Sequence, residues 1–174
     1  PKAVEGRTEL DAVLAYLQHV GRAELSDAEA DEHARLVAAT GEIENLSAAI
    51  SRELAPLART LKEADITASK ETTELLERLF QTIQESAHAA LRALVEDDER
   101  AAQAVVASRG AVLELTAELQ RKQAARLVGD DPDLLLKHRV QFEVLDKLRR
   151  IYSVAEHMAI SVLPRSALVG ELSV

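Results

Sequence analysis

The stretch from Asp131 to Pro164 constrains the fold most, because it has the start and stop signals of one long helix. Asp131 can cap the first turn, Pro132 suits the first helical position, and Pro164 ends the run. Two apolar stripes run along it at three-and-four spacing, namely Leu135, Phe142, Leu145, Tyr152, Ala155, Ala159 and Val162, and Val140, Val144, Leu148, Ile151, Val154 and Met158. A helix that is apolar over so much of its surface needs neighbours on two sides.

Composition favours an all-α fold. Hydrophobic residues make up 47% of the chain but aromatic residues only 2%, so the core must be built from Leu, Val, Ile and Ala. The net charge of -9 opposes an electrostatic grip on nucleic acid or an anionic membrane, which both require a positive surface. The chain has no cysteine, which excludes disulfides, thiolate metal sites and cysteine nucleophiles.

Caps and breakers divide the rest of the chain into further helices. Ser26 and Glu29 form a capping-box pattern, Pro56 predicts a break or kink, and the acidic cluster at 96–99 favours a new helix start. The predicted helices cover residues 8–22, 26–54, part of 57–69 before a linker, 71 to about 95, and 98–128 with a stop at Gly129. Their predicted buried faces are Leu10, Val13, Leu14, Leu17 and Val20; Leu36, Ala39, Ile43, Leu46 and Ile50; Leu76, Phe80, Ile83, Ala87, Ala90 and Leu94; and Val105, Val112, Leu115 and Leu119.

The segments Leu145–Ser153, LDKLRRIYS, and His157–Pro164, HMAISVLP, carry a family resemblance. Their leucine-rich basic body, small apolar tail and final proline resemble the end of the PhoU-like cytoplasmic domain of bacterial sodium/phosphate cotransporter-family proteins. The resemblance implies an antiparallel bundle of long helices, with residues 1–69 as a partial first repeat and linker and residues 70–174 as a complete three-helix repeat with a C-terminal tail. A shift of 105 residues places Ser26 on Asp131 and His33 on His138, which fits either a duplication or a shared helical period.

The same resemblance implies a function. It predicts a non-catalytic regulatory domain at the cytoplasmic face of the inner membrane, which modulates sodium-dependent phosphate uptake through protein contacts. The expected partners are its own transmembrane portion or a phosphate transporter, with a second copy of the chain as a further candidate. No stretch approaches the roughly 20 apolar residues of a membrane helix, so a membrane portion is expected outside this sequence. The alternatives are a free-standing PhoU-type regulator, a plain helical scaffold or oligomerisation module, and a metal-binding helical enzyme.

The spacing of acidic residues along a helix indicates whether the chain carries a PhoU-type metal site. PhoU proteins carry Glu/Asp-x-x-x-Asp motifs, in which two carboxylates one turn apart bind metal clusters. On the last helix, bases replace the second acids, in Asp146/Arg150 and Glu143/Lys147. We expect these residues to form ordinary ion pairs along the helix.

Asp27 and Asp31 alone keep the acidic spacing, and His33 follows them on the same helix. These three residues are the metal candidates, although acids at a helix start more often offset the helix dipole. Glu29/His33 and Glu85/His88 are half-sites at most, and His138 is expected in the core. No catalytic arrangement is recognisable, so neither a cofactor nor enzyme activity is expected.

Overall fold

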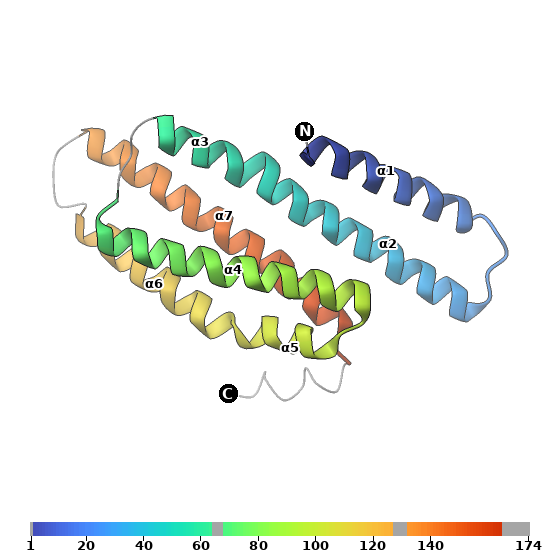
Figure 1. Cartoon of the computed structure of the whole chain (residues 1–174). Helices are drawn as coiled ribbons and strands as arrows, with labels where there is room; N and C mark the ends of the chain where they lie inside the picture. Colours follow the sequence, from blue (N-terminus) through green and yellow to red (C-terminus); the bar gives the residue numbers. More distant parts are fainter. Residues whose placement is uncertain (1, 64–67, 127–131, 165–174) are drawn as a thin grey trace.

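The computed structural model describes residues 2–63, 68–126 and 132–164, and these are helical throughout apart from short connections (Figure 1). The protein is all-α, as the sequence predicts. Its elements are α1 Lys2–Val20, α2 Asp27–Ala48, the π-helical segment η1 Ala49–Leu54, α3 Ala55–Glu63, α4 Lys70–Glu96, α5 Glu99–Ala107, α6 Arg109–Arg126 and α7 Pro132–Val162. Since α2, η1 and α3 are continuous and α5 meets α6 at Ser108, the described chain consists of five long helical rods.

Helix α7 is central, as predicted from its two apolar stripes. It packs against α4 and α5 on one side and against α2, η1 and α3 on the other (Figure 1). Both stripes are largely buried, through Leu145, Tyr152, Ala155 and Ala159 and through Val140, Leu148, Ile151 and Met158. Phe142 is exposed, so its predicted place in the core is wrong. The doubly apolar surface of α7 thus joins two groups of helices.

The buried face of α4 lies one residue away from the predicted one at its N-terminal half. Leu75 and Leu79 are buried, whereas Leu76 is only half-buried and Phe80 is exposed. Farther along α4, Ile83, Ala87 and Ala90 are buried as predicted. The predicted face of the following rod is confirmed, because Val105, Val112, Leu115 and Leu119 are all buried.

Of the predicted break or kink at Pro56, the break is wrong, because the second rod continues past this residue. The backbone N–H of Ala55 bonds to the carbonyl of Ile50, a five-residue spacing that defines the π-helical turn η1 directly before the proline. Pro56 lacks an N–H and its ring crowds the carbonyl one turn earlier, and a local widening of the helix accommodates both effects. The sequence predicted the position of the irregularity and mistook its form.

Local capping chemistry sets the helix starts. Glu29 Oε2 accepts a hydrogen bond from the backbone N–H of Ser26 at 2.8 Å, which belongs to the predicted capping box, and a second one from the Ser26 hydroxyl at 2.6 Å. These bonds lower the pKa of Glu29. At the acidic cluster, Asp97 ends α4 with a left-handed φ of 56°, and Asp98 Oδ1 accepts from the N–H groups of Arg100 and Ala101 at 3.0 and 3.1 Å. The predicted helix start at this cluster is confirmed.

Ser108 interrupts the rod that was predicted to be one helix over 98–128. Its N–H bonds to the carbonyls of Ala104 and Val105, at 3.2 and 3.1 Å, and its hydroxyl donates to the Val105 carbonyl at 2.7 Å. A serine hydroxyl that competes for a helix carbonyl in this way loosens the local turn. The rod therefore consists of α5 and α6.

Helix α1 packs mainly on α2 and buries less than its sequence predicted. Leu17 is buried, whereas Val13 is 46% exposed. On α2 and η1, Leu46 is buried as predicted, whereas Leu36 and Ile50 are exposed. The apolar stripes of α1, α2 and η1 are therefore only partly covered by neighbouring helices.

Some predictions fall outside the described residues. These are the stop at Gly129, the cap at Asp131, and the side chains of Leu135 and His138. Among the described helices, none combines the length and the apolar content needed to cross a bilayer.

Candidate functional site

The three metal candidates lie at the start of α2, where His33 has a different partner. Its Nε2 atom lies 2.8 Å from the carbonyl oxygen of Leu17, and because a carbonyl only accepts, this nitrogen must donate. The ring sits against Gly21, where an added Cβ would lie 2.9 Å from it. His33 thus ties α2 to the end of α1, and its Nε2 is occupied by that bond.

Asp27 and Asp31 are exposed and one turn apart in the first turns of α2. Within the described part of the chain, no group of three His, Asp or Glu side chains is placed to hold a metal ion. The structure therefore does not bring the candidates into a convergent site. Their position at a helix N-terminus suits compensation of the helix dipole.

The predicted ion pairs along α7 are replaced by contacts to another rod. Lys147 Nζ lies 3.1 Å from Glu53 Oε2, and Arg150 Nη1 lies 3.0 Å from Glu53 Oε1. The predicted Glu143/Lys147 and Asp146/Arg150 pairs are wrong, because the half-buried Glu53 of η1 reaches both cations. A carboxylate shared by two cations in a partly desolvated place is favoured over fully exposed pairs one turn apart.

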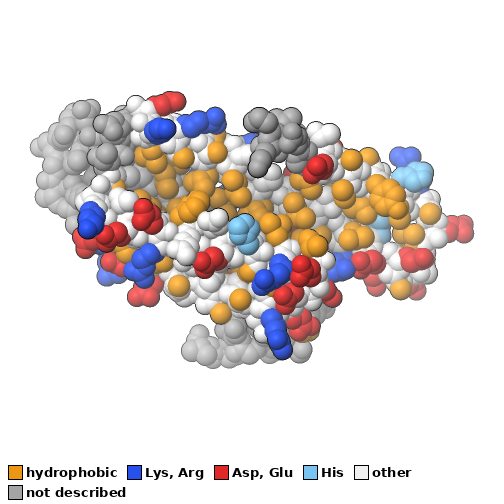
Figure 2. Space-filling model, in the orientation of Figure 1, with side chains coloured by type: hydrophobic (Ala, Val, Ile, Leu, Met, Phe, Trp, Pro, Cys, Tyr) orange, Lys and Arg blue, Asp and Glu red, His pale blue; other side chains and the backbone are white. Residues whose placement is uncertain are grey.

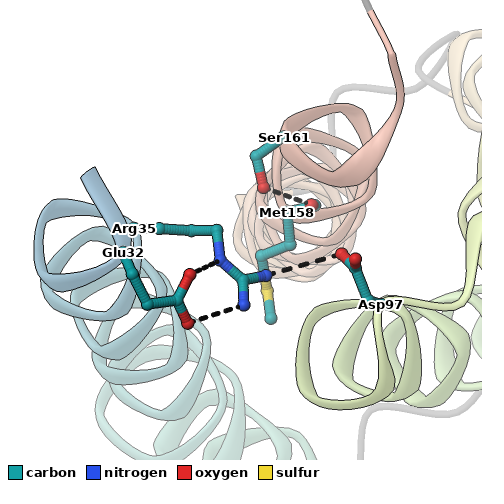
Figure 3. A network of polar contacts seen from close by, with 5 residues as sticks. All are labelled: Glu32, Arg35, Asp97, Met158 and Ser161. Carbon is teal, nitrogen blue, oxygen red and sulfur yellow. Dashed lines mark hydrogen bonds and ion pairs between the residues drawn. The ribbon is translucent and has the colours of Figure 1, made fainter. Parts of the chain in front are cut away.

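Two more polar contacts hold α2 beside the other rods. His157 Nδ1 on α7 lies 2.9 Å from Glu42 Oε1 on α2. Arg35 binds both oxygens of Glu32, at 2.8 and 2.9 Å, and reaches Asp97 at the end of α4 through Nη1 at 3.4 Å (Figure 3). The pair with Glu32 lowers the pKa of that carboxyl and raises the pKa of Arg35.

A hydroxyl cluster lies where α4, α7 and the junction of α5 with α6 meet. The hydroxyls of Ser86 and Ser108 are 2.9 Å apart, and Tyr152 donates to the carbonyl of Val105 at 2.9 Å. Burial is the main cause that raises the pKa of Tyr152, and the charge of Glu156 adds to it. The contact between the Ser86 and Ser108 hydroxyls and the bond from Tyr152 to Val105 therefore join three rods.

An apolar groove lies between η1–α3 and α4, with α7 as its floor. One section, with a volume of about 400 Å³, has a lining of Leu46, Ile50, Leu54, Ala55, Ala58, Phe80, Ile83, Gln84, Ala87, His88, Leu91, Leu148 and Ile151. A second section of about 310 Å³ shares Leu54, Ala58, Phe80 and Leu148 and extends to Leu61, Thr73, Leu76, Glu77 and Val144. Hydrophobic side chains gather along it on the face that Figure 2 shows. We call this feature the apolar groove.

Two large side chains define the apolar groove and were predicted to be core. Phe80 is 50% exposed and Ile50 is 43% exposed. They stay open because η1–α3 and α4 both pack on α7 and leave the space between them unfilled. One feature of the sequence indicates this exposure. Helix α4 carries two adjacent apolar stripes at its start, and a single neighbouring rod cannot cover both.

The lining of the apolar groove is mostly hydrophobic. It offers aromatic and aliphatic side chains with few polar groups, and its lining residues stand on long helices held by core contacts. An amphipathic helix is the kind of element that such a groove accepts.

Comparison with known proteins gives no relative to set beside this geometry. No protein-family model, no curated protein and no solved structure matches the chain.

Proposed function

We propose that this chain is a non-catalytic regulatory domain that acts through protein contacts at the apolar groove. The observation that carries the proposal is the groove itself, where Phe80 and Ile50 stand exposed between two rods that rest on α7. Exposed aromatic and aliphatic side chains in a preformed hollow are typical of contact surfaces, and scattered single exposures are not.

The transport role rests on the resemblance of the α7 segments to the PhoU-like domain of sodium/phosphate cotransporters. On that basis the domain lies at the cytoplasmic face of the inner membrane and modulates sodium-dependent phosphate uptake by contact with a membrane portion. A free-standing regulator that binds a phosphate transporter in trans uses the same surface. The difference lies in the native gene, which encodes membrane segments in the first case and none in the second.

Uptake of labelled phosphate tests the role. The full-length native protein is compared with a version that lacks residues 1–174, across a range of external phosphate and sodium concentrations. We expect deletion to change how uptake responds to phosphate supply while its sodium dependence stays the same. Unchanged regulation in the deleted protein would refute the transport role.

A point variant connects this role to the apolar groove. Phe80→Asp should reproduce the effect of the deletion, since it places a charge in the apolar lining. Leu113→Asp is the matched control, because Leu113 is 53% exposed on α6 and lies outside the groove lining. If both variants regulate uptake normally, the groove is not the contact surface.

A further inference from the structure

We infer that the apolar groove receives a basic amphipathic helix, whose apolar face fills the groove and whose Lys or Arg side chains lie along the α4 edge beside Glu77. The inference rests on the proposed function, because it takes the groove as the contact surface for the membrane portion and adds the chemistry of the segment that binds there. It follows from the length of the groove, from the charges along its two edges and from the charge of the whole chain.

The length and the lining of the groove suit a helix. Along α4 the lining extends from Thr73 to Leu91, a distance of about 27 Å at the helical rise, which a partner helix of about 18 residues matches. Apolar side chains at i, i+3 or i+4, i+7 and i+11 form one stripe of such a helix. This stripe reaches both the space between Ile50 and Phe80 and the second section beside Leu61.

A single acidic side chain lines the groove, and none of the lining residues is Lys or Arg. The polar residues of the lining are Gln84, His88, Thr73 and Glu77. The acid, Glu77, is exposed, and no cation of the described residues pairs with it. Its neighbour Glu74, by contrast, lies 3.9 Å from Lys70 Nζ. Glu77 is therefore the lining residue that is free to pair with a cation of a partner.

The two edges of the groove differ in charge. Outside the lining, the α3 edge carries the exposed cations Arg59 and Lys62 with the acid Glu63 beside them, so a further cation gains little there. On the α4 edge, Glu77 belongs to the lining, whereas the next residue, Arg78, lines a separate hollow between α4 and α6. The α4 edge is thus the one that attracts a Lys or Arg of the partner, and this difference sets how the partner helix is turned about its axis.

The charge of the whole chain acts in the same direction. Its net charge is -9, which raises the local concentration of basic segments around it. Loops that membrane proteins expose on the cytoplasmic side carry an excess of Lys and Arg near the membrane. A membrane portion on the proposed side of the bilayer therefore offers segments of the sign that this chain and Glu77 attract.

Two designed peptides test the inference on the 174-residue chain. Both are fluorescent amphipathic helices of about 18 residues with the same leucine stripe, and they differ only in having Lys or Glu at the positions that flank the stripe. At about 50 mM salt, fluorescence anisotropy should show at least about fivefold tighter binding of the Lys peptide. The preference should shrink at about 1 M salt, because charges are then screened beyond about 3 Å, while the apolar contact remains.

Variants of the chain separate the groove from the overall charge. Glu77→Lys should weaken binding of the Lys peptide roughly threefold to tenfold and strengthen binding of the Glu peptide, because it reverses the charge beside the groove. Glu114→Lys is the matched control, since it changes the net charge equally but lies on α6 outside the groove lining, and it should change the preference less than about twofold. Phe80→Asp should weaken both peptides at least about tenfold. Circular dichroism confirms that each variant keeps its helix content.

Equal binding of the two peptides to the wild-type chain would overturn the inference, as would a preference that Glu77→Lys leaves unchanged or that Glu114→Lys alters just as much. No binding of either peptide up to about 100 µM would overturn it as well. A failure of the proposed function is distinguishable from these outcomes. If deletion leaves the regulation of uptake unchanged while the Lys peptide still binds through Glu77, the transport role alone fails; if Phe80→Asp alters uptake while the peptides bind equally, the basic partner alone fails.

Discussion

Replacement of Tyr152 by Phe removes one hydroxyl from a buried contact between α7 and the junction of α5 with α6. The hydroxyl donates to the carbonyl of Val105 at 2.9 Å and lies 3.4 Å from the hydroxyl of Ser108. The ring itself stays, so no cavity forms. The Val105 carbonyl also accepts from the N–H of Ser108 at 3.1 Å, so the change leaves no orphaned acceptor. We therefore expect a loss of about 0.5–1.5 kcal/mol in the free energy of unfolding, the net value of one hydrogen bond.

The pH dependence of this loss follows from the raised pKa of Tyr152. Burial disfavours the phenolate, and Glu156 adds to the effect, while the bond from Ser108 and the charge of Arg109 act against it. In the unfolded chain the tyrosine ionises near pH 10. Since the folded chain keeps its proton to a higher pH, the contribution of Tyr152 is complete below about pH 10 and is lost as the pH rises through the folded pKa.

Urea unfolding followed by circular dichroism measures both effects. At about pH 8 the wild-type chain should be more stable than Tyr152→Phe by the stated amount. At about pH 11 the difference should shrink, because the tyrosine of the unfolded wild-type chain ionises first, which favours the unfolded state, and the variant has no such group. Tyr16→Phe is the control, since Tyr16 is exposed and its replacement should cost little stability. A difference that is the same at both pH values would refute the reasoning, and a loss above about 3 kcal/mol would show that the backbone at Ser108 depends on this bond.

Three further changes have clear expectations. Leu148→Asp should cost several kcal/mol in thermal or urea unfolding because Leu148 is buried on α7, and full stability would place it outside the core; Leu113→Asp is the exposed control and should cost little. Ser26→Ala should cost about 1 kcal/mol. It should also reduce the loss of stability that occurs as the pH falls through the lowered pKa of Glu29, because it removes the hydroxyl bond and keeps the backbone bond to that carboxylate; identical acid unfolding curves would contradict this. Elemental analysis after chelation should find no metal that the fold needs, and iron or zinc whose removal lowers stability would instead assign His33 and its acidic neighbours as ligands.

The positions of the helices could be predicted from the sequence because they depend on interactions between residues close together in the chain. The capping box at Ser26 and the start at Asp98 use side chains that bond to the backbone within three residues, so their pattern contains the whole interaction. Pro56 disturbs the helix within one turn, and the sequence located the disturbance for the same reason. The π-helical form was not readable, because a break and a widened turn begin with the same residue.

The sequence alone could not predict which of two neighbouring apolar faces of a helix is buried. On α4 both Leu75 with Leu79 and Leu76 with Phe80 keep the four-residue spacing, and only the position of the neighbouring rods decides which pair is buried. Glu53 shows the same limit for charge. It is 94 residues from Lys147 along the chain, so local spacing favoured Glu143 as the partner.

The apolar groove could not be predicted from the sequence for a related reason. A groove exists where two rods share a floor and do not meet, which is a property of the assembled bundle and of no single segment. The metal candidates were predicted from local spacing along α2. The structure instead pairs the ring nitrogen of His33 with the carbonyl of Leu17, which lies 16 residues away in the sequence.

Polar contacts of the second rod help to hold the helices that border the apolar groove. Glu42 with His157 and Glu53 with Arg150 fix the second rod to α7, and Arg35 reaches the end of α4, while none of these residues fills the groove. The rods that border the hollow are thus also held by contacts outside its lining. A preformed surface binds with less ordering of side chains and backbone than one that must open first. Changes to exposed lining residues such as Phe80 should therefore alter binding while the bundle stays folded, which makes the binding and stability measurements independent.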